Sequence, residues 1–386
     1  MKPELRYGLM YFMYFAAFSG FSTFRNLYFS DIGLTGFQMG LIGAVVTAVG
    51  TLAQPVWGLV SDWRGFEKNI LVYASIISGL VVLIYPAASF IHEPFYFILI
   101  GTGVFAVFQA PLSPVLDSVV LSSLTDYGKA RSFGSVSFGV GALIFGLLIP
   151  VFSSAVVFYF YTLFVFTLAV LAYGTSTERT EKIETVGSGA VKLLRNRDFF
   201  ILLMSTFIVG VTLVPGGEFL SVYMDQIGGP DLYTGLSWLI ATVVEALVFV
   251  YLSRKNYSYR WLVAFGGVGY AVKYLFFFLV PVPNWILVLH LVIGFSFAPF
   301  YYGAVHLTFN LVPDSLRTTG QTLLWSAVFG IGAGVGQLLS GYLIDSVGIV
   351  ELYLYLSAIA FAGSLIVFFV STNNEARRTN HNSSEA

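Results

Sequence analysis

Long runs of apolar residues fill most of the chain and are separated by short segments rich in charged residues, proline and glycine. Breaking the chain at those segments leaves runs close to the length of about 20 residues that an α-helix needs to cross a membrane. The twelve predicted spans are 8–29, 36–60, 69–90, 94–124, 132–152, 155–173, 199–223, 232–253, 260–280, 284–311, 318–341 and 348–370. Because the runs are continuously apolar and do not alternate with a period of two, helices are favoured over a membrane β-barrel. The pattern therefore predicts an all-α integral membrane protein.

The composition argues against a water-soluble fold. Hydrophobic residues make up 57% of the 386 residues and charged residues only 10%, with a mean hydropathy of +0.83. That balance leaves too little polar surface to cover a soluble protein. The net charge of −1 offers no basic surface for nucleic acid. Since the sequence contains no cysteine, disulfide bonds, thiolate chemistry and cysteine metal sites are excluded as well.

The distribution of basic residues orients the predicted spans. With the N-terminus in the cytoplasm, all of the 19 lysine and arginine residues lie in cytoplasmic segments except Arg25 and Lys273, which fall within spans. Basic residues accumulate on the cytoplasmic side of membrane proteins, so this bias supports an even number of spans with both termini cytoplasmic. The first apolar run has no small-residue cleavage site and is expected to be retained. A multi-pass protein of the cytoplasmic (inner) membrane is expected.

Two pairs of similar segments predict an internal repeat. The run "LIGAVVTAV" begins at Leu41 and "LIATVVEAL" at Leu239, while "RSFG" begins at Arg131 and "RTTG" at Arg317. Each pair is separated by about half the chain. The domains expected are an N-terminal six-helix half (1–173), a cytoplasmic linker (174–198), a parallel C-terminal six-helix half (199–371) and a cytoplasmic tail (372–386). Chance similarity between apolar segments is the alternative.

The segment "GLVSDWRGFEK", at the end of the 36–60 span, resembles the cytoplasmic loop signature of the major facilitator superfamily. Gly58, Asp62 and Gly65 are in register with that signature, whereas aromatic residues replace two of its usual basic positions. The resemblance covers essentially the whole chain and implies the major facilitator fold, with twelve helices in two parallel six-helix repeats. It also implies that these three residues and Arg64 form a gating loop that stabilises the outward-facing state.

Two further segments resemble the proton-symporter branch that includes lactose permease and nucleoside permeases. They are "PVLDSVVLSSLTDYGKARSFGSVSFGVG" and the 232–253 span with its buried glutamate. In that branch a carboxylate at this place belongs to the proton-coupling machinery, and Glu245 is the residue that matches. The branch often places a histidine near an acid in the span corresponding to 284–311. Here His306 has no acid within a helical turn, so that relay does not carry over.

Five strongly ionisable residues lie within the predicted spans: Arg25, Asp117, Glu218, Glu245 and Lys273. An unpaired charge in a membrane helix costs at least about 2.5 kcal/mol, so these side chains are expected to line a shared polar interior. If each base neutralises one acid, one carboxyl remains, and a buried carboxyl is most easily kept neutral by a proton. This is the minimum requirement for a proton-coupled carrier, with structural ion pairing as the alternative.

Glu245 is the first candidate for the proton carrier, followed by Asp117 and Glu218. Glu245 lies roughly 12 Å from the nearer end of its helix, too deep to reach water, and the aligned repeat position is Thr47. The sequence "VPGG" before Glu218 predicts a kinked helix. Lys273 is expected to pair with Glu245 or Glu218. The other base, Arg25, either pairs or extends outward to water.

Neutral polar and aromatic side chains within the spans are the candidate substrate contacts, since sugar sites combine flat aromatic faces with hydrogen-bonding groups. The candidates are Asn26, Gln54, Gln109, Tyr270, His290, Tyr301, Tyr302, His306, Gln321 and Trp325. This set favours sugars or nucleosides over lipophilic drugs.

The sequence therefore predicts a proton-coupled symporter of a small polar solute that works by alternating access. Expected partners are the solute, protons and the lipid bilayer, without nucleic acid, and the protein is expected to function as a monomer. No cofactor or metal beyond the proton gradient is expected. A proton-driven exporter of drugs or metabolites is the alternative. An intramembrane enzyme is disfavoured, because the sequence has neither a H-E-x-x-H nor a G-x-S-x-G motif.

Overall fold

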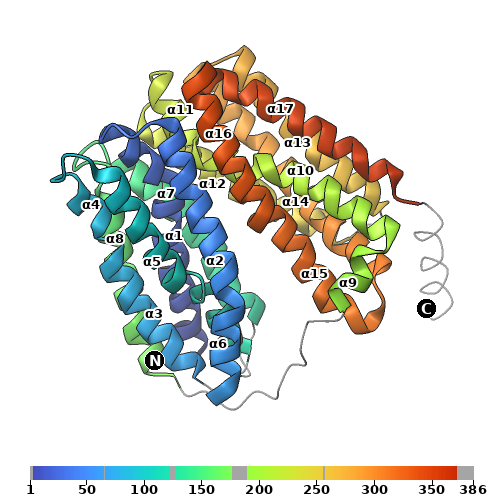
Figure 1. The fold of residues 1–386 in the computed structure, drawn as a ribbon, viewed down its shortest axis with the longest axis horizontal. Helices are drawn as coiled ribbons and strands as arrows, with labels where there is room; N and C mark the ends of the chain where they lie inside the picture. Colours follow the sequence, from blue (N-terminus) through green and yellow to red (C-terminus); the bar gives the residue numbers. More distant parts are fainter. Residues whose placement is uncertain are drawn as a thin grey trace. The chain divides into compact units, whose positions relative to one another are not determined.

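The structure is a computed structural model that describes residues 3–64, 66–121, 123, 127–175, 189–254 and 257–371 (Figure 1). All regular structure in these ranges is helical. The α-helices are α1 (Pro3–Asp31), α2 (Gly36–Arg64), α3 (Glu67–Val81), α4 (Ile84–Ala88), α5 (Pro94–Gln109), α6 (Leu112–Leu121), α7 (Tyr127–Leu148), α8 (Val156–Tyr173), α9 (Gly189–Leu194), α10 (Arg197–Glu218), α11 (Leu220–Gln226), α12 (Asp231–Leu252), α13 (Tyr259–Leu279), α14 (Pro283–Leu311), α15 (Arg317–Trp325), α16 (Ala333–Val347) and α17 (Ile349–Ile366). Short 3₁₀ segments, η1 (Asp314–Leu316) and η3 (Val367–Phe369), and a π-helical segment, η2 (Ser326–Gly332), complete the list. The all-α prediction is confirmed.

Eleven segments of the described chain are long and apolar enough to cross a membrane, and they coincide with the predicted spans from 36–60 onward. The remaining predicted span, 8–29, lies within α1, which is 29 residues long. Four polar side chains of α1 are buried: Ser19, Thr23, Arg25 and Asn26. The predicted number of twelve is thus nearly met, and α1 is the long helix with a buried polar face.

Several predicted spans are divided between two helices, and proline explains one of these breaks. Pro111, between α5 and α6, has no N–H to donate to the carbonyl of Val107, four residues earlier. The Trp57 indole of α2 donates to that carbonyl instead, with Nε1 and O 2.7 Å apart. The packing of α2 against α5 therefore satisfies the backbone acceptor that the proline leaves without its helical donor.

The kink predicted before Glu218 stays a prediction: α10 continues through Pro215 to Glu218, and the helix is interrupted only at Phe219, before α11 begins. Side chains bind backbone carbonyls on both sides of Pro215. The Tyr274 hydroxyl donates to the carbonyl of Thr212 at 2.9 Å, and the Asn26 amide donates to the carbonyl of Glu218 at 3.2 Å. These bonds hold the interrupted segment at a defined position.

The helices form two compact units. Unit 1 comprises Met1–Ile183, Gly217–Thr242 and Leu338–Ser346, and unit 2 comprises Glu184–Gly216, Val243–Gln337 and Val347–Ala386. The core of unit 1 contains an aromatic cluster of Phe21, Tyr85, Phe105, Phe158 and Tyr161. The core of unit 2 is built mainly from aliphatic residues of α10, α13, α14 and α15. The predicted division at the 174–198 linker stays a prediction, because residues 176–188 and the predicted tail at 372–386 lie outside the described ranges.

In unit 1, α12 approaches α7 at backbone distance. A Cβ atom on Gly235 would lie 2.4 Å from the carbonyl oxygen of Ala142, and one on Gly146 would lie 2.8 Å from that of Asp231. In the same unit, the start of α2 contacts α16. The Asp345 carboxylate of α16 accepts hydrogen bonds from the N–H groups of Gly36 and Phe37 at 2.6 and 2.8 Å. The contact between α12 at Gly235 and the Ala142 carbonyl of α7 is possible only for glycine, because any side chain would overlap that oxygen.

We expect Gly235→Ala to destabilise unit 1 by about 1–3 kcal/mol, because the new methyl group would overlap the α7 backbone, which cannot rotate away. Gly103→Ala is the matched control, since nothing lies within 4 Å of a Cβ atom at that helical position. Thermal unfolding of both variants in detergent measures the effect. Equal unfolding midpoints would contradict the close packing of α7 and α12.

Candidate functional site

One face of α1 carries a row of polar and aromatic side chains. Tyr11, Tyr14, Phe18, Ser22 and Arg25 are spaced by three or four residues and therefore lie along one side of the helix. The row extends over about 21 Å at 1.5 Å per residue. A carboxyl group from another helix contacts each end of it, so α1 links two charged centres of unit 1.

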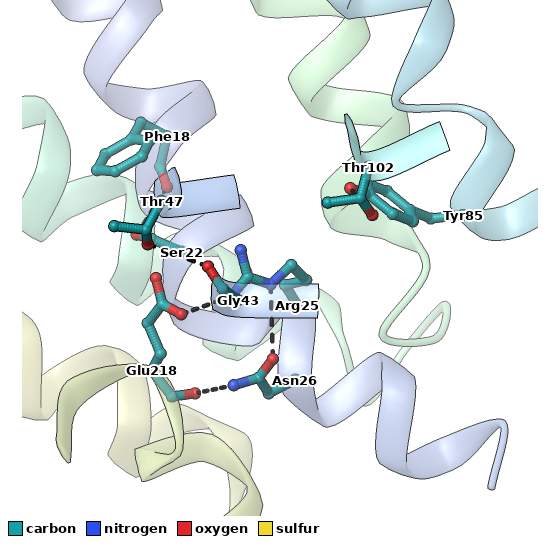
Figure 2. A network of polar contacts seen from close by, with 9 residues as sticks. All are labelled: Phe18, Ser22, Arg25, Asn26, Gly43, Thr47, Tyr85, Thr102 and Glu218. Atoms are coloured by element: carbon teal, nitrogen blue, oxygen red, sulfur yellow. Dashed lines mark hydrogen bonds and ion pairs between the residues drawn. The ribbon is translucent and has the colours of Figure 1, made fainter. Parts of the chain in front are cut away.

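The first centre is an ion pair between Arg25 of α1 and Glu218 of α10. The guanidinium Nη2 and the carboxylate Oε2 are 2.5 Å apart, and the two side chains are 1% and 17% exposed. Figure 2 shows Asn26 beside this pair, with its amide donating to the Glu218 carbonyl. The guanidinium also lies 5.0 Å from the Phe21 ring centroid. Arg25 is therefore paired inside the protein and does not extend outward to water.

The second centre is Asp117 of α6. Its Oδ1 atom accepts a hydrogen bond from the Tyr11 hydroxyl at 2.5 Å and one from the Tyr127 hydroxyl at 3.3 Å. The Arg131 guanidinium lies over the rings of Phe15 and Tyr11, at 4.2 and 5.6 Å from their centroids. Two phenolic hydroxyls therefore donate to one oxygen of this carboxyl group.

Glu245 of α12 lies in unit 2 and is partly buried. Gly294 of α14 brings the two helices close together, because a Cβ atom there would lie 2.6 Å from the Glu245 backbone nitrogen. Among the described residues, Glu245 forms no salt bridge. It differs in this respect from Glu218.

Lys273 of α13 is buried, with 2% of its surface exposed. Its Nζ atom lies over three rings, at 4.2 Å from the centroid of Tyr274, 5.0 Å from Phe277 and 5.5 Å from Tyr270. The described residues provide no carboxylate within ion-pair distance of it. Within unit 2, the predicted pairing of Lys273 with Glu245 is therefore corrected, because cation–π contacts surround the lysine. The alternative pairing with Glu218, which binds Arg25 in unit 1, stays a prediction.

We expect Lys273→Met to leave the unfolding midpoint in detergent unchanged or raised. Methionine keeps an unbranched apolar stem against the same rings and removes the cost of burying a charge without a carboxylate. Lys273→Ala is the comparison, because it removes the stem too and should lower stability by about 2 kcal/mol or more through the cavity it leaves. A methionine variant as unstable as the alanine variant would show that the charge itself stabilises the fold.

The predicted substrate contacts fall into separate groups. Asn26 adjoins the Arg25 pair, the Gln109 amide donates to the Tyr14 hydroxyl at 3.3 Å, and the Tyr270 ring centroid lies 5.5 Å from the Lys273 Nζ atom. These three side chains are thus brought to the charged centres of their own units. In contrast, Gln54 is exposed on α2.

The other candidates lie in unit 2. Tyr301 and Trp325 stack with their ring centroids 4.4 Å apart, and the Gln321 amide donates to the Val305 carbonyl at 2.9 Å. His306 stacks on Tyr302 at 4.0 Å, and its Nδ1 is 2.8 Å from the Tyr302 carbonyl. His290 is fully buried, with Nδ1 2.7 Å from the Ile286 carbonyl. Both histidines therefore use one ring nitrogen in their own helix.

Of the predicted gating loop, Gly58 is the residue that the structure describes in full. It is exposed near the end of α2, and a Cβ atom on it would meet nothing within 4 Å. Gly65 and the side chains of Asp62 and Arg64 lie outside the described part of the chain. The latch role stays a prediction.

The sequence reasoning missed Tyr11 and Tyr127, which contact Asp117. Tyr11 is four helical turns before Arg25 on the same face of α1, so the helical period could have identified it as a partner for a buried acid. Tyr127 lies at the start of α7, and its contact with α6 has no comparable signal in the sequence.

Comparison with known proteins identifies the kind of molecule that this site belongs to. The sequence model described as "MFS_1 like family" matches residues 5–355. The uncharacterized transporter YwbF of Bacillus subtilis (strain 168) is 24% identical over 358 residues, which cover 90% of this chain and 88% of the relative. The maltose permease of Geobacillus stearothermophilus is 25% identical over 379 residues, covering 95% and 94% of the two chains.

The fold has counterparts among solved structures. The crystal structure of the nucleoside transporter NupG superimposes with a TM-score of 0.84 at 14% identity, covering 96% of this chain and 99% of that one. At this level of identity the likeness shows a shared fold alone.

Proposed function

Because this chain belongs to the MFS_1 like family, and is therefore a multi-pass membrane transporter with the major facilitator fold, we propose that it carries a small sugar across the membrane together with a proton. The full-length similarity to a maltose permease supports the sugar class. The hydrogen-bonding side chains around Arg25 and Tyr14 agree with a neutral polar solute better than with a lipophilic drug.

Proton coupling rests on one observation. Glu245 lies within a membrane-length helix and forms no salt bridge with any described residue, whereas Glu218 is paired with Arg25. An ionised carboxylate in that setting costs roughly 2.5–3.5 kcal/mol, so protonation is the simplest way to make its burial tolerable. A carboxyl that takes up and releases a proton once per cycle supplies the coupling.

The proposed cycle is alternating access, in which two six-helix halves expose a central site first to one side of the membrane and then to the other. The sequence has no nucleotide-binding loop of the P-loop type, so the proton gradient is the proposed energy source. In this proposal the protein works as a monomer in the cytoplasmic membrane with both termini in the cytoplasm, as the basic residues indicate.

The test is uptake by wild-type protein in proteoliposomes with an imposed pH gradient. Maltose, glucose, a nucleoside and a lipophilic dye are offered in turn while the internal pH is recorded. The proposal predicts sugar accumulation when the outside is acidic, with simultaneous acidification of the interior. Sugar release driven by an inward proton gradient would indicate an exporter instead, and transport of the dye alone would contradict the sugar class.

A further inference from the structure

One side of α12 carries buried polar groups whose hydrogen-bonding partners are missing from the described residues. The hydroxyls of Thr234 and Ser237 and the indole nitrogen of Trp238 have no hydrogen-bond partner there. Thr234 is 1% exposed and Ser237 0%. Buried polar groups in native proteins are nearly always paired, so three such groups within two turns of one helix require an explanation.

The helical period places these groups on one side of α12. Thr234, Trp238 and Glu245 are separated by four and seven residues and therefore lie on the same face, with Ser237 at its edge. The adjoining face packs against α7 through Gly235, close to the Ala142 carbonyl. Thr234, Ser237 and Trp238 therefore lie beside the contact between α7 and α12. Together with Glu245 they form a polar stripe along α12.

Aromatic rings connect this stripe to the row on α1. The rings of Trp238 and Phe138 meet edge to face with centroids 5.5 Å apart, and Phe138 lies 6.3 Å from Phe18. Phe18 in turn stacks parallel to Tyr14 at 6.1 Å. All four rings belong to unit 1.

The indole also packs against the backbone of Gly217, the residue before Glu218. A Cβ atom on Gly217 would lie 2.9 Å from the six-membered ring of Trp238, so the absence of a side chain there makes room for the indole. The following residue is Glu218, whose carboxylate binds Arg25.

From these contacts we propose that Thr234, Ser237 and Trp238 recognise the hydroxyl groups of a sugar ring, with Trp238 as the residue that determines specificity. The inference rests on the proposed function and specifies its substrate class as a polyhydroxylated ring. Flat aromatic faces bind the apolar face of such a ring, while the indole N–H and the two hydroxyls bind its oxygens. These groups are covered in the present structure, so the sugar binds when the face opens during alternating access.

The test compares Trp238→Phe, Ser237→Ala and Thr234→Val, which remove a hydrogen-bonding group and retain the approximate shape. Sugar exchange without a pH gradient and sugar-induced stabilisation in detergent report binding independently of proton coupling. We expect Trp238→Phe to raise the apparent KM for maltose or glucose by about 3- to 10-fold, the effect of one hydrogen bond. One monodeoxy sugar lacks the hydroxyl group that the Trp238 indole binds. For that sugar, Trp238→Phe should leave the apparent KM unchanged, because the hydrogen bond is already missing in the wild-type complex.

Trp285→Phe is the matched control, since Trp285 is 55% exposed at the start of α14. Unchanged KM values and unchanged preference among deoxy sugars in all three variants would overturn the assignment, even if wild-type protein accumulates sugar with protons. A wild-type protein that exchanges and is stabilised only by solutes without hydroxyl groups would overturn it too. Failure of proton-driven accumulation with normal sugar exchange would contradict the proposed coupling and leave this assignment supported.

Discussion

Replacement of Glu245 by glutamine is expected to abolish accumulation of sugar against its gradient while exchange of sugar across the membrane continues at close to the wild-type rate. Glutamine has nearly the same shape as a protonated glutamate but cannot release a proton. The Gly294 contact constrains the α12 backbone at this position, so an isosteric change should leave the helix in place. The loss should therefore be confined to coupling, with the accumulation ratio falling to about 1 as it does for a facilitator without a driving ion.

The measurement is uptake in proteoliposomes with and without a pH gradient, together with exchange at equal pH on both sides. Glu351→Gln is the matched control, because Glu351 is exposed in the first turn of α17. If Glu245→Gln accumulates sugar as well as wild type does, Glu245 is not the coupling carboxyl. Asp117 would then be tested next, since two phenols bind it and no described basic residue pairs with it.

The second large effect concerns the buried ion pair of unit 1. We expect Glu218→Ala to lower the free energy of unfolding by about 3–5 kcal/mol, because it leaves the Arg25 guanidinium buried without its carboxylate. Arg25 is 1% exposed, so its guanidinium depends on this carboxylate for charge compensation. The double variant Arg25→Met, Glu218→Met should recover most of the loss, since both charges are then removed and the volume is nearly conserved.

Thermal or denaturant unfolding in detergent micelles compares the single and double variants. Asp314→Ala is the control, because Asp314 pairs with Arg317 three residues away on an exposed segment and is 73% exposed. Exposed pairs contribute about 0–1 kcal/mol, so this variant should be close to wild type. A Glu218→Ala protein as stable as Asp314→Ala would mean that Arg25 finds another acceptor.

The two predictions separate roles that the sequence treats alike. Both Glu218 and Glu245 are single carboxylates in apolar helices, yet the structure gives one an arginine partner and the other none among the described residues. Removal of Glu218 should therefore appear first as lost stability and removal of the Glu245 charge as lost coupling. If both variants only unfold the protein, the carboxyls are structural.

Some details of the fold had local signals in the sequence and others did not. The kink expected before Glu218 rests on a proline and two glycines, which act on the backbone of their own helix. The π-helical segment at Ser326–Gly332 has no such signal, because it depends on how neighbouring backbones approach. A Cβ atom on Gly332 would lie 3.0 Å from the Phe207 carbonyl of another helix, a contact that only packing creates.

The sequence by itself determined that the chain is an all-helical membrane protein, and where nearly all of its spans lie, because hydropathy and helix breaking depend on residues that are neighbours along the chain. It also identified the buried Arg25 and Lys273 and the membrane-helix carboxylates Asp117, Glu218 and Glu245. Only the tertiary structure decided their partners: Arg25 and Glu218 are 193 residues apart, Tyr11 and Asp117 are 106 apart, and Lys273 lies among aromatic rings. Which charges meet depends on the rotation and packing of whole helices, and no local pattern of residues encodes that choice.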